Sequence, residues 1–335
     1  MKLRERYVLI SADYSQQEPK LLAAFCRDEN MIDTINKDKD LYAMVASKAF
    51  HLPYEECLEH FPKDTPIKKI EDKWYYSTLS DYDKLADGIT DTYSDGKKRR
   101  SQAKVILLGL LYGRGVKALA QQLGSSKQEA KDIIDSVFSA FPKIKEFENQ
   151  SKQFCKDNEY VTTLWGRKRR LPEINLPEYE FDYSKRPLMG DVDKQQFEKK
   201  YKRLLNSKWG DDKKKLIEDI KKAENVIIKD NTGTIAEAER EVVNSMIQLS
   251  AADMTKLSMI ELSKSEELKK LKCNMLIPIH DEILFECPVY NAETAMKYIS
   301  DIMSHIAEEK TGMIIKVDPT CSFAWSGEEV DLQAI

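Results

Sequence analysis

Two apolar runs near opposite ends of the chain constrain its fold more than any other feature. The run Tyr7-Val8-Leu9-Ile10 leads to Asp13, and the run from Met275 to Ile279 leads to His280-Asp281-Glu282. Short apolar runs that end at polar residues are typical of buried strands. If both strands belong to one sheet, the carboxylates of Asp13 and Asp281 converge, and like charges so close together favour a cation between them. Such a site suits Mg²⁺, which prefers oxygen ligands.

The composition excludes several other classes of protein. Of the 335 residues 41% are hydrophobic and 33% are charged, and no run approaches the roughly 18 apolar residues that span a membrane. The six cysteines form no C-x-x-C pair and the four histidines are dispersed, so we expect buried, reduced thiols rather than a zinc site or a disulfide framework. The amino terminus lacks the apolar core of a secretory signal, which predicts a cytoplasmic protein.

Basic residues are concentrated locally, although the net charge of −4 taken alone argues against nucleic-acid binding. Residues 97–100 and 167–170 contain only lysine and arginine. Arg100 and Lys104 are four residues apart and therefore lie on one face of a helix. In isolation such a pair is most often a solvated basic face. Here the helix continues through Gly109 to Tyr112-Gly113, and this favours a phosphate-binding element beside the carboxylates.

Hydrophobic periodicity predicts a mixture of helices and strands. We expect strands over 7–13, 275–279, 283–285 and 314–317, a basic-tipped hairpin over 160–171, and helices over 16–26, 41–50, 99–111, 116–123, 127–140, 143–158, 236–262 and 291–308. Ser15 and Glu18 have the spacing of a capping box at the start of the first helix, with Pro19 in its first turn. Residues 53–98 read as an irregular insertion. Residues 191–230 read as surface helices that dock a partner, shield DNA or are simply solvated.

Five segments, in their order along the chain, resemble the polymerase module of family A DNA polymerases, the group of bacterial DNA polymerase I. Asp13-Tyr14-Ser15-Gln16-Gln17-Glu18 resembles motif A, and its QQEP variant resembles phage replicative enzymes. Motif B is matched by Arg100 to Lys104 with Gly109 and Tyr112-Gly113, and motif C by His280-Asp281-Glu282. The other two segments are Thr163 to Pro172 and Arg240-x-x-x-Asn244-x-x-x-Gln248. The resemblance covers nearly the whole chain apart from 53–98 and 175–234.

This resemblance implies an α+β right-hand polymerase fold, with an antiparallel sheet in the palm, mostly helical fingers, and no thumb or exonuclease. Residues 1–20 would form the first part of the palm and 235–335 its second part. Residues 21–234 would form the fingers, with insertions at about 53–98 and 175–234. Because motif A lies so close to residue 1, we expect a second polypeptide that carries a thumb and a 3′–5′ exonuclease. A truncated reading frame or an excised fragment is the alternative.

The activity implied by the resemblance is that of a DNA-templated DNA polymerase. It would transfer a nucleotide from a dNTP to a primer 3′-hydroxyl during DNA replication with two Mg²⁺ ions, and would bind primer-template DNA and no membrane. Its location would be cytoplasmic, in a host cell if the chain is encoded by a phage. A non-catalytic remnant that acts as a DNA-binding scaffold is the alternative. A single-subunit RNA polymerase would share the paired aspartates, but Glu18 matches the family's steric gate against ribonucleotides.

The resemblance also assigns roles to individual residues, and they fall into three groups. Asp13, Tyr14 and Asp281 would hold the metal ions, with Glu282 as an accessory carboxylate and Lys104 as a proton donor to pyrophosphate. The residues expected around the incoming nucleotide are Arg100, Lys104, Leu108, Tyr112, Glu18, Tyr42 and Gln16. The residues expected to contact DNA are Arg240, Asn244, Gln248, His280 and Arg167.

Three positions depart from the family's pattern. Leu108 stands where the family usually has an aromatic residue beside the incoming sugar, so discrimination between sugars is open. Tyr42 replaces a histidine that contacts the triphosphate, and its hydroxyl still donates a hydrogen bond but carries no charge. Lys20 replaces an arginine, which is a milder change.

Overall fold

The computed structural model describes residues 6–59, 94–186 and 189–325, the backbone of 67–70 and 73–76, and three positions near the C-terminus, Gly327, Val330 and Leu332. The chain divides into two compact units. The first unit comprises Met1–Ser151, Thr162–Arg169 and Val243–Ile335, and the second comprises Lys152–Val161 and Arg170–Val242. The predicted division into palm and fingers follows different boundaries and stays a prediction.

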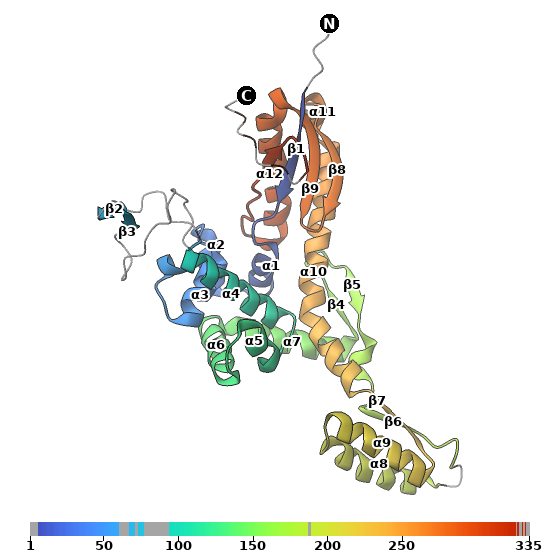
Figure 1. The fold of residues 1–335 in the computed structure, drawn as a ribbon. Helices are drawn as coiled ribbons and strands as arrows, with labels where there is room; N and C mark the ends of the chain where they lie inside the picture. Colours follow the sequence, from blue (N-terminus) through green and yellow to red (C-terminus); the bar gives the residue numbers. More distant parts are fainter. Residues whose placement is uncertain are drawn as a thin grey trace. The chain divides into compact units, whose positions relative to one another are not determined.

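An antiparallel sheet of four strands lies in the first unit, in the order β10-β1-β9-β8 (Figure 1). Its strands are β1 (Tyr7–Asp13), β8 (Asn274–Ile279), β9 (Glu282–Pro288) and β10 (Thr320–Ser322). Alternate residues of β1 are buried, as expected for a strand with one face on a core. The β1–β9 register sets Asp13 opposite Glu282. The predicted pairing of the two apolar runs in one sheet is therefore confirmed.

The predicted closing strand at 314–317 is wrong. Only Val317 forms a bridge there, to Tyr14, and the closing strand is β10, three residues later. The Ser15 N–H donates to the Lys316 carbonyl at 2.9 Å and the Asp318 N–H donates to the Asp13 carbonyl at 3.4 Å. These are the two hydrogen bonds of that single antiparallel bridge, and the ladder does not extend over the rest of 314–317.

A long helix, α12 (Ala292–Thr311), packs on β1 and β9. Its buried residues Ala295, Ile299, Met303 and Ile306 recur at spacings of three and four, which places them on one side of the helix. They join the buried residues of β1 and β9, and Met254 of α10 (Thr232–Lys264), in one hydrophobic core. This core holds rigid the strand ends that carry Asp13 and Asp281.

The remaining helices of the first unit follow the predicted pattern closely. They are α1 (Gln17–Cys26), α2 (Glu29–Asn36), α3 (Leu41–Phe50), α4 (Ser94–Leu111), α5 (Val116–Leu123), α6 (Lys127–Ala140), α7 (Pro142–Asn158), which continues into the second unit, and α11 (Glu266–Lys270). Short 3₁₀ helices lie at Tyr54–Cys57 (η1) and Val289–Asn291 (η3). Periodicity did not predict α2, which begins at the N-cap Asp28, whose side chain accepts from the N–H groups of Asn30 and Met31.

The predicted capping box at the start of α1 is wrong. The N-cap residue is Gln16, in the left-handed conformation with φ 53°, and no side chain caps the helix. The side chains of Gln16 and Glu18 have partners far along the chain. Gln16 Oε1 accepts from the Leu41 N–H at 3.1 Å, and the Glu18 carboxylate accepts from the Tyr112 hydroxyl. Long-range contacts therefore replaced the local motif.

The second unit contains its own hydrophobic core. Strands β6 (Tyr179–Asp182) and β7 (Ile227–Asp230) pair antiparallel, beside helices α8 (Asp191–Asn206) and α9 (Gly210–Glu224) and a 3₁₀ helix, η2 (Pro172–Asn175). The core consists of Tyr179, Phe197, Tyr201, Leu205, Ile217, Ile220, Val226 and Ile228. The helices predicted over 191–230 are confirmed, and a few residues of each pack into this core while most of the others are exposed.

Two small hairpins complete the fold. The predicted basic hairpin is present as β4 (Tyr160–Thr162) and β5 (Lys168–Arg170), with Gly166 at φ 84° in its turn. Strands β2 (Ile67–Ile70) and β3 (Lys73–Tyr76) pair within the segment that was expected to be irregular. The rest of that insertion from residue 60 to 93 lies outside the described residues. The α+β class is confirmed.

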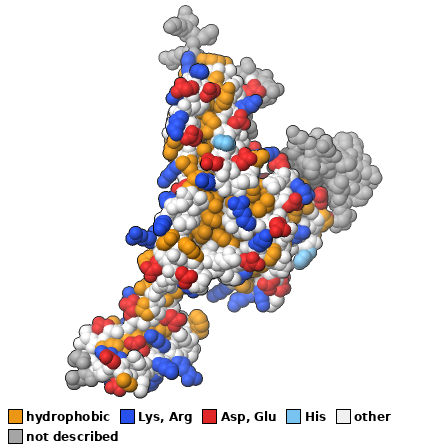
Figure 2. Space-filling model, turned by 180° about the vertical axis from the view of Figure 1, so that it is seen from behind, with side chains coloured by type: hydrophobic (Ala, Val, Ile, Leu, Met, Phe, Trp, Pro, Cys, Tyr) orange, Lys and Arg blue, Asp and Glu red, His pale blue; other side chains and the backbone are white. Residues whose placement is uncertain are grey.

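The surface and the thiols agree with the composition. Figure 2 shows basic and acidic side chains interspersed over the visible face. All six cysteines are buried and free, as predicted. Among the helices of the described segments, none has the length and apolar character needed to cross a bilayer.

Candidate active site

A cavity of about 370 Å³ lies in the first unit, where β1 ends and α1 begins. It collects residues that are far apart in the sequence. Its lining residues are Asp13, Tyr14, Ser15, Gln16, Gln17, Glu18, Pro19, Tyr42, Arg100, Lys104, Leu108, Asp281 and Asp318. The metal-binding and nucleotide-binding residues named from the sequence all line this cavity, apart from Tyr112 and Glu282, which lie next to it through contacts described below.

Carboxylates meet at one side of this cavity. The pKa of Asp13 is raised to about 6. Burial of the carboxyl is the largest cause, followed by the negative charges of Asp281 and Glu282 and by a hydrogen bond shared with Asp281. Because neighbouring carboxylates raise this pKa, the positive groups nearby do not fully neutralise the negative charge of the site. The donor set is therefore one that a hard divalent cation fits, with oxygen atoms as its only ligands.

The cavity offers fewer metal ligands than a metal ion coordinated by protein groups alone would need. In the described part of the chain, no three histidine, cysteine, aspartate or glutamate side chains are grouped as a complete metal site. Mg²⁺ commonly keeps several waters and is held by one or two carboxylates together with substrate phosphates. Asp13 and Asp281 match that pattern.

A third carboxylate, Asp318, lines the same cavity and was not predicted. It follows the run Ile314-Ile315-Lys316-Val317, so the signal was the one used for Asp13 and Asp281, an acidic residue after an apolar run. The Asp318 N–H donates to the carbonyl of Asp13, which fixes its position at the end of β1. Asp318 is a further candidate for the metal site.

The contacts of two predicted metal-site residues limit the roles that they can take. The Tyr14 side chain is fully buried, and its hydroxyl lies 2.6 Å from Ser258 Oγ and donates to the Met303 carbonyl at 3.0 Å. Its phenol therefore faces the core, and only its main-chain carbonyl is left as a ligand. Glu282 does not line the cavity, because its carboxylate accepts a hydrogen bond from Ser11 Oγ at 2.6 Å. It acts on Asp13 through its charge.

The cationic side of the cavity lies on α4, where Arg100 and Lys104 share a face as predicted. Tyr42 of α3 is almost fully buried between them and the core. The guanidinium carbon of Arg100 lies 5.4 Å from the centre of the Tyr42 ring, and Lys104 Nζ lies 6.0 Å from it. The Tyr42 ring therefore lies within cation–π distance of both cations.

Glu18 and Tyr112 form a second polar contact. The Tyr112 hydroxyl lies 3.0 and 2.8 Å from the two carboxylate oxygens of Glu18. Burial and then this bond to a negative group raise the pKa of Tyr112 to about 12, so the phenol stays protonated and donates. Gln248 Nε2 lies 3.5 Å from the same hydroxyl. The contact links residues that the sequence assigned separately to the nucleotide and to the duplex.

The other four residues predicted to contact DNA lie in different surroundings. His280 is exposed at the β8–β9 turn with φ 57°, a conformation that short hairpin turns require. Arg167 forms an ion pair of 2.8 Å with Asp253 and donates to the Leu249 carbonyl at 2.9 Å, so it is bound to α10. Asn244 has a buried Oδ1 that lacks a partner within the described residues. Arg240 belongs to the second unit. These four roles stay predictions.

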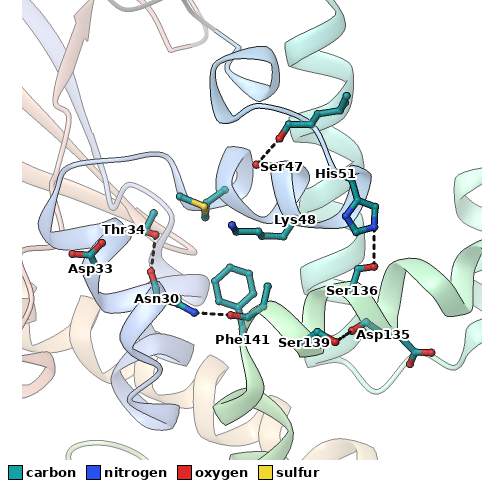
Figure 3. Close-up of a pocket in the computed structure, with 13 residues that line it drawn as sticks. Asn30, Asp33, Thr34, Ser47, Lys48, His51, Asp135, Ser136, Ser139 and Phe141 are labelled. Carbon is teal, nitrogen blue, oxygen red and sulfur yellow. Dashed lines mark hydrogen bonds between the residues drawn. The ribbon is translucent and has the colours of Figure 1, made fainter.

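A larger cavity, of about 800 Å³, contains none of the predicted site residues. It lies between α2, α3 and α6, and Figure 3 shows its wall. Much of the polar wall is already paired, since Asn30 Nδ2 donates to the Ala140 carbonyl at 2.8 Å and Ser136 Oγ lies 3.3 Å from His51 Nε2. The smaller cavity, with its excess of carboxylates facing two cations, is the better candidate for chemistry.

Curated relatives of this chain are bacterial DNA polymerases I. DNA polymerase I of Bacillus subtilis is 26% identical over 299 residues, which cover 89% of this chain and 24% of the relative. DNA polymerase I of Borreliella burgdorferi is 29% identical over 300 residues, which cover 90% of this chain and 23% of the relative. The chain therefore spans about a quarter of the length of these curated relatives.

A solved structure and a family model complete the comparison. The POL domain of Pol1 from M. smegmatis, in complex with DNA primer-template and dNTP, superposes with a TM-score of 0.64 at 23% identity, over 96% of this chain and 41% of that one. At this identity the match shows the fold alone. The model of DNA polymerase family A matches residues 2–61, 82–186 and 201–327. These segments make up most of the sequence, and the chain belongs to DNA polymerase family A.

Proposed function

We propose that this chain carries the nucleotidyl-transfer site of a DNA-directed DNA polymerase that adds dNTPs to a primer in DNA replication. One observation carries the proposal, namely the cavity that brings Asp13, Asp281, Arg100 and Lys104 together from three distant parts of the sequence. Carboxylates on one side and cations on the other suit a metal-bound triphosphate. The M. smegmatis neighbour was solved with primer-template and dNTP, which supports the same ligands here.

Asp13 and Asp281 are the proposed ligands of two Mg²⁺ ions, with the main-chain carbonyl of Tyr14 beside them. When bound, such ions lower the pKa of the primer 3′-hydroxyl and neutralise charge on the triphosphate. Asp13 has a raised pKa in the bare site, so a cation would favour its ionised form. Asp318 is placed to add a carboxylate, and Glu282 adds negative charge from outside the cavity.

Arg100 and Lys104 are the proposed triphosphate-binding residues, because both line the cavity from one face of α4. The Tyr42 ring beneath them limits the positions that the two cations can take. Lys104 is also the proposed proton donor to the leaving pyrophosphate. Gln16 and Leu108 complete the walls around the nucleotide.

Glu18 is proposed as the steric gate against ribonucleotides. Its carboxylate is held by the Tyr112 hydroxyl and lines the cavity at the start of α1. A carboxylate fixed in this way leaves little room for a 2′-hydroxyl. Leu108 is smaller and more flexible than an aromatic residue, so Glu18 carries more of the discrimination.

Primer extension tests the proposal. We expect extension of a primer-template by dNTPs with Mg²⁺, and its loss by at least about a thousandfold in Asp281→Asn, because removing a group that stabilises transition-state charge costs that much. Asp132→Asn is the matched control, since Asp132 is exposed on α6 and its carboxylate accepts from Gln128 Nε2 at 2.8 Å, away from the cavity. Undiminished extension by Asp281→Asn would refute the two-metal assignment and favour the scaffold alternative.

Three wider parts of the hypothesis stay predictions: the division into palm and fingers, the cytoplasmic or phage-host location, and the second polypeptide with thumb and exonuclease. The assay also tests the last of these. Extension by the chain with the product of a neighbouring reading frame, and none by the chain alone, would support the second polypeptide.

A further inference from the structure

Two carboxylates outside the cavity bind the Arg100 guanidinium. Arg100 Nε donates to Asp40 Oδ2 at 2.7 Å, and Arg100 Nη1 donates to Glu59 Oε2 at 3.3 Å. All three side chains are only 22 to 24% exposed, so solvent screens these contacts less than it screens surface ion pairs. Neither Asp40 nor Glu59 lines the cavity, while Arg100 does.

The two carboxylates differ in how firmly they are placed. Asp40 is the N-cap of α3, and its Oδ1 accepts from the Ala43 N–H at 2.9 Å. It has a structural role whether or not Arg100 is present. Glu59 lies beyond η1. It also forms an ion pair of 3.1 Å with Lys97, whose side chain is 59% exposed.

Glu59 belongs to an acidic segment, residues 55–59, that faces the basic start of α4. In the same segment, Glu56 accepts from Arg99 through its main-chain carbonyl at 2.8 Å and lies 3.5 Å from Arg99 Nη1 through its carboxylate. Arg99 does not line the cavity. The segment therefore offers two similar acid–arginine pairs, of which only one involves a residue of the proposed active site.

The charges around Arg100 indicate how the Glu59–Arg100 pair affects nucleotide binding. Asp40 and Glu59 form one cluster with two cations, Arg100 and Lys97, in which both carboxylates contact Arg100, so the field that Arg100 presents to the cavity is largely cancelled. A triphosphate must then compete with Glu59 for guanidinium N–H groups, since both are acceptors that prefer a charged donor. Asp40 alone would neutralise Arg100 once and still orient it.

We propose that Glu59 is a carboxylate that competes with the triphosphate for Arg100 and so weakens nucleotide binding, and that nucleotide binding releases Arg100 from the acidic segment. The inference rests on the proposed function, because it takes Arg100 as a triphosphate-binding residue. It makes Glu59 a positioning residue that sets the KM for dNTPs without contacting the reacting atoms.

The test compares Glu59→Gln with Glu56→Gln, which alters the neighbouring pair and leaves Arg100 unchanged. We expect Glu59→Gln to lower the KM for dNTPs about three- to tenfold with kcat within twofold of wild type, as the loss of one partly screened charge pair predicts. Glu56→Gln is expected to leave both constants within twofold. A KM that is unchanged or raised in Glu59→Gln overturns the proposal, and so does an equal decrease in both variants.

A binding measurement without DNA separates this inference from the proposed function. The probe is inorganic tripolyphosphate, titrated by calorimetry into wild type, Glu59→Gln, Arg100→Ala and the double variant. We expect tighter binding in Glu59→Gln and no effect of the same substitution in the Arg100→Ala background. An equal effect in both backgrounds would mean that Glu59 acts by general charge, which overturns the proposal. A wild-type chain that binds tripolyphosphate but extends no primer would instead count against the polymerase assignment alone.

Discussion

Replacing Asp13 by asparagine is expected to abolish primer extension and yet stabilise the fold at neutral pH in the absence of metal. Burial and the charges of Asp281 and Glu282 raise the pKa of Asp13 from 3.8 to about 6. Its folded-state pKa is thus above the unfolded value. The protonated Asp13 carboxyl makes its full contribution to the free energy of unfolding below pH 3.8, and this contribution is lost as the pH rises through 6. Asparagine stays neutral throughout, so the variant avoids this loss.

The size of the effect follows from the shift. A change of roughly 2 pH units corresponds to about 3 kcal/mol for a fully shielded group. Asp13 is partly exposed at the cavity, and solvent screening reduces this to about 1 kcal/mol at pH 7.5. The difference in unfolding free energy between Asp13→Asn and wild type is then near zero at pH 4 and reaches its plateau above pH 6.

Urea unfolding in EDTA at several pH values measures this difference. The two compact units can unfold separately, so a local probe is needed. Trp165 packs against the sheet core and reports on the first unit, and the other three tryptophans, Trp74, Trp209 and Trp325, are replaced by phenylalanine. Asp132→Asn is the control and should show no pH-dependent gain. Addition of Mg²⁺ should stabilise wild type and not Asp13→Asn. A variant less stable than wild type at pH 7.5 in EDTA would refute the reasoning.

Three further predictions concern single side chains. Glu18→Ala should raise ribonucleotide incorporation at least about tenfold in a competition assay, and Tyr112→Phe, which removes only the hydroxyl that holds Glu18, should raise it less; an unchanged ratio in Glu18→Ala would contradict the gate. Tyr14→Phe should destabilise the first unit by about 1 to 3 kcal/mol in urea unfolding, because it leaves buried Ser258 without its phenol partner; a neutral effect would show that water or rearrangement replaces the bond. Phe197→Ala should destabilise the second unit by about 3 kcal/mol and leave Trp165 unfolding unchanged, since Phe197 belongs to the separate core there; a shift of the Trp165 transition would show that the two units unfold together.

The sequence predicted the centre of the site because its signals are local. Asp13 ends β1 and Asp281 lies in the turn after β8, each after a short apolar run, and antiparallel pairing of β1 with β9 then brings them together. Arg100 and Lys104 needed only helical spacing. In each case the period of the backbone determines where the side chain points, so a short window of sequence was sufficient.

Other parts of the site could not be predicted because tertiary contacts decide them. Ser15 and Glu18 have the spacing of a capping box, but the hydroxyl of Tyr112, 94 positions away, takes the Glu18 carboxylate. Glu59 comes from a segment with no periodicity, and its role depends on Arg100, which is 41 positions away. None of these partners is marked by spacing.

Motif A thus contains two carboxylates whose different surroundings give them different chemistry. Burial and the charges of Asp281 and Glu282 raise the pKa of Asp13 to about 6, and a bound cation would lower that pKa. The Glu18 carboxylate instead accepts hydrogen bonds from the Tyr112 hydroxyl. Five residues along the chain are enough for this separation because β1 ends at Asp13 and α1 begins at Gln17, which turns the two side chains toward different partners. A metal added to this site should therefore lower the pKa of Asp13 and leave the Glu18–Tyr112 bond in place.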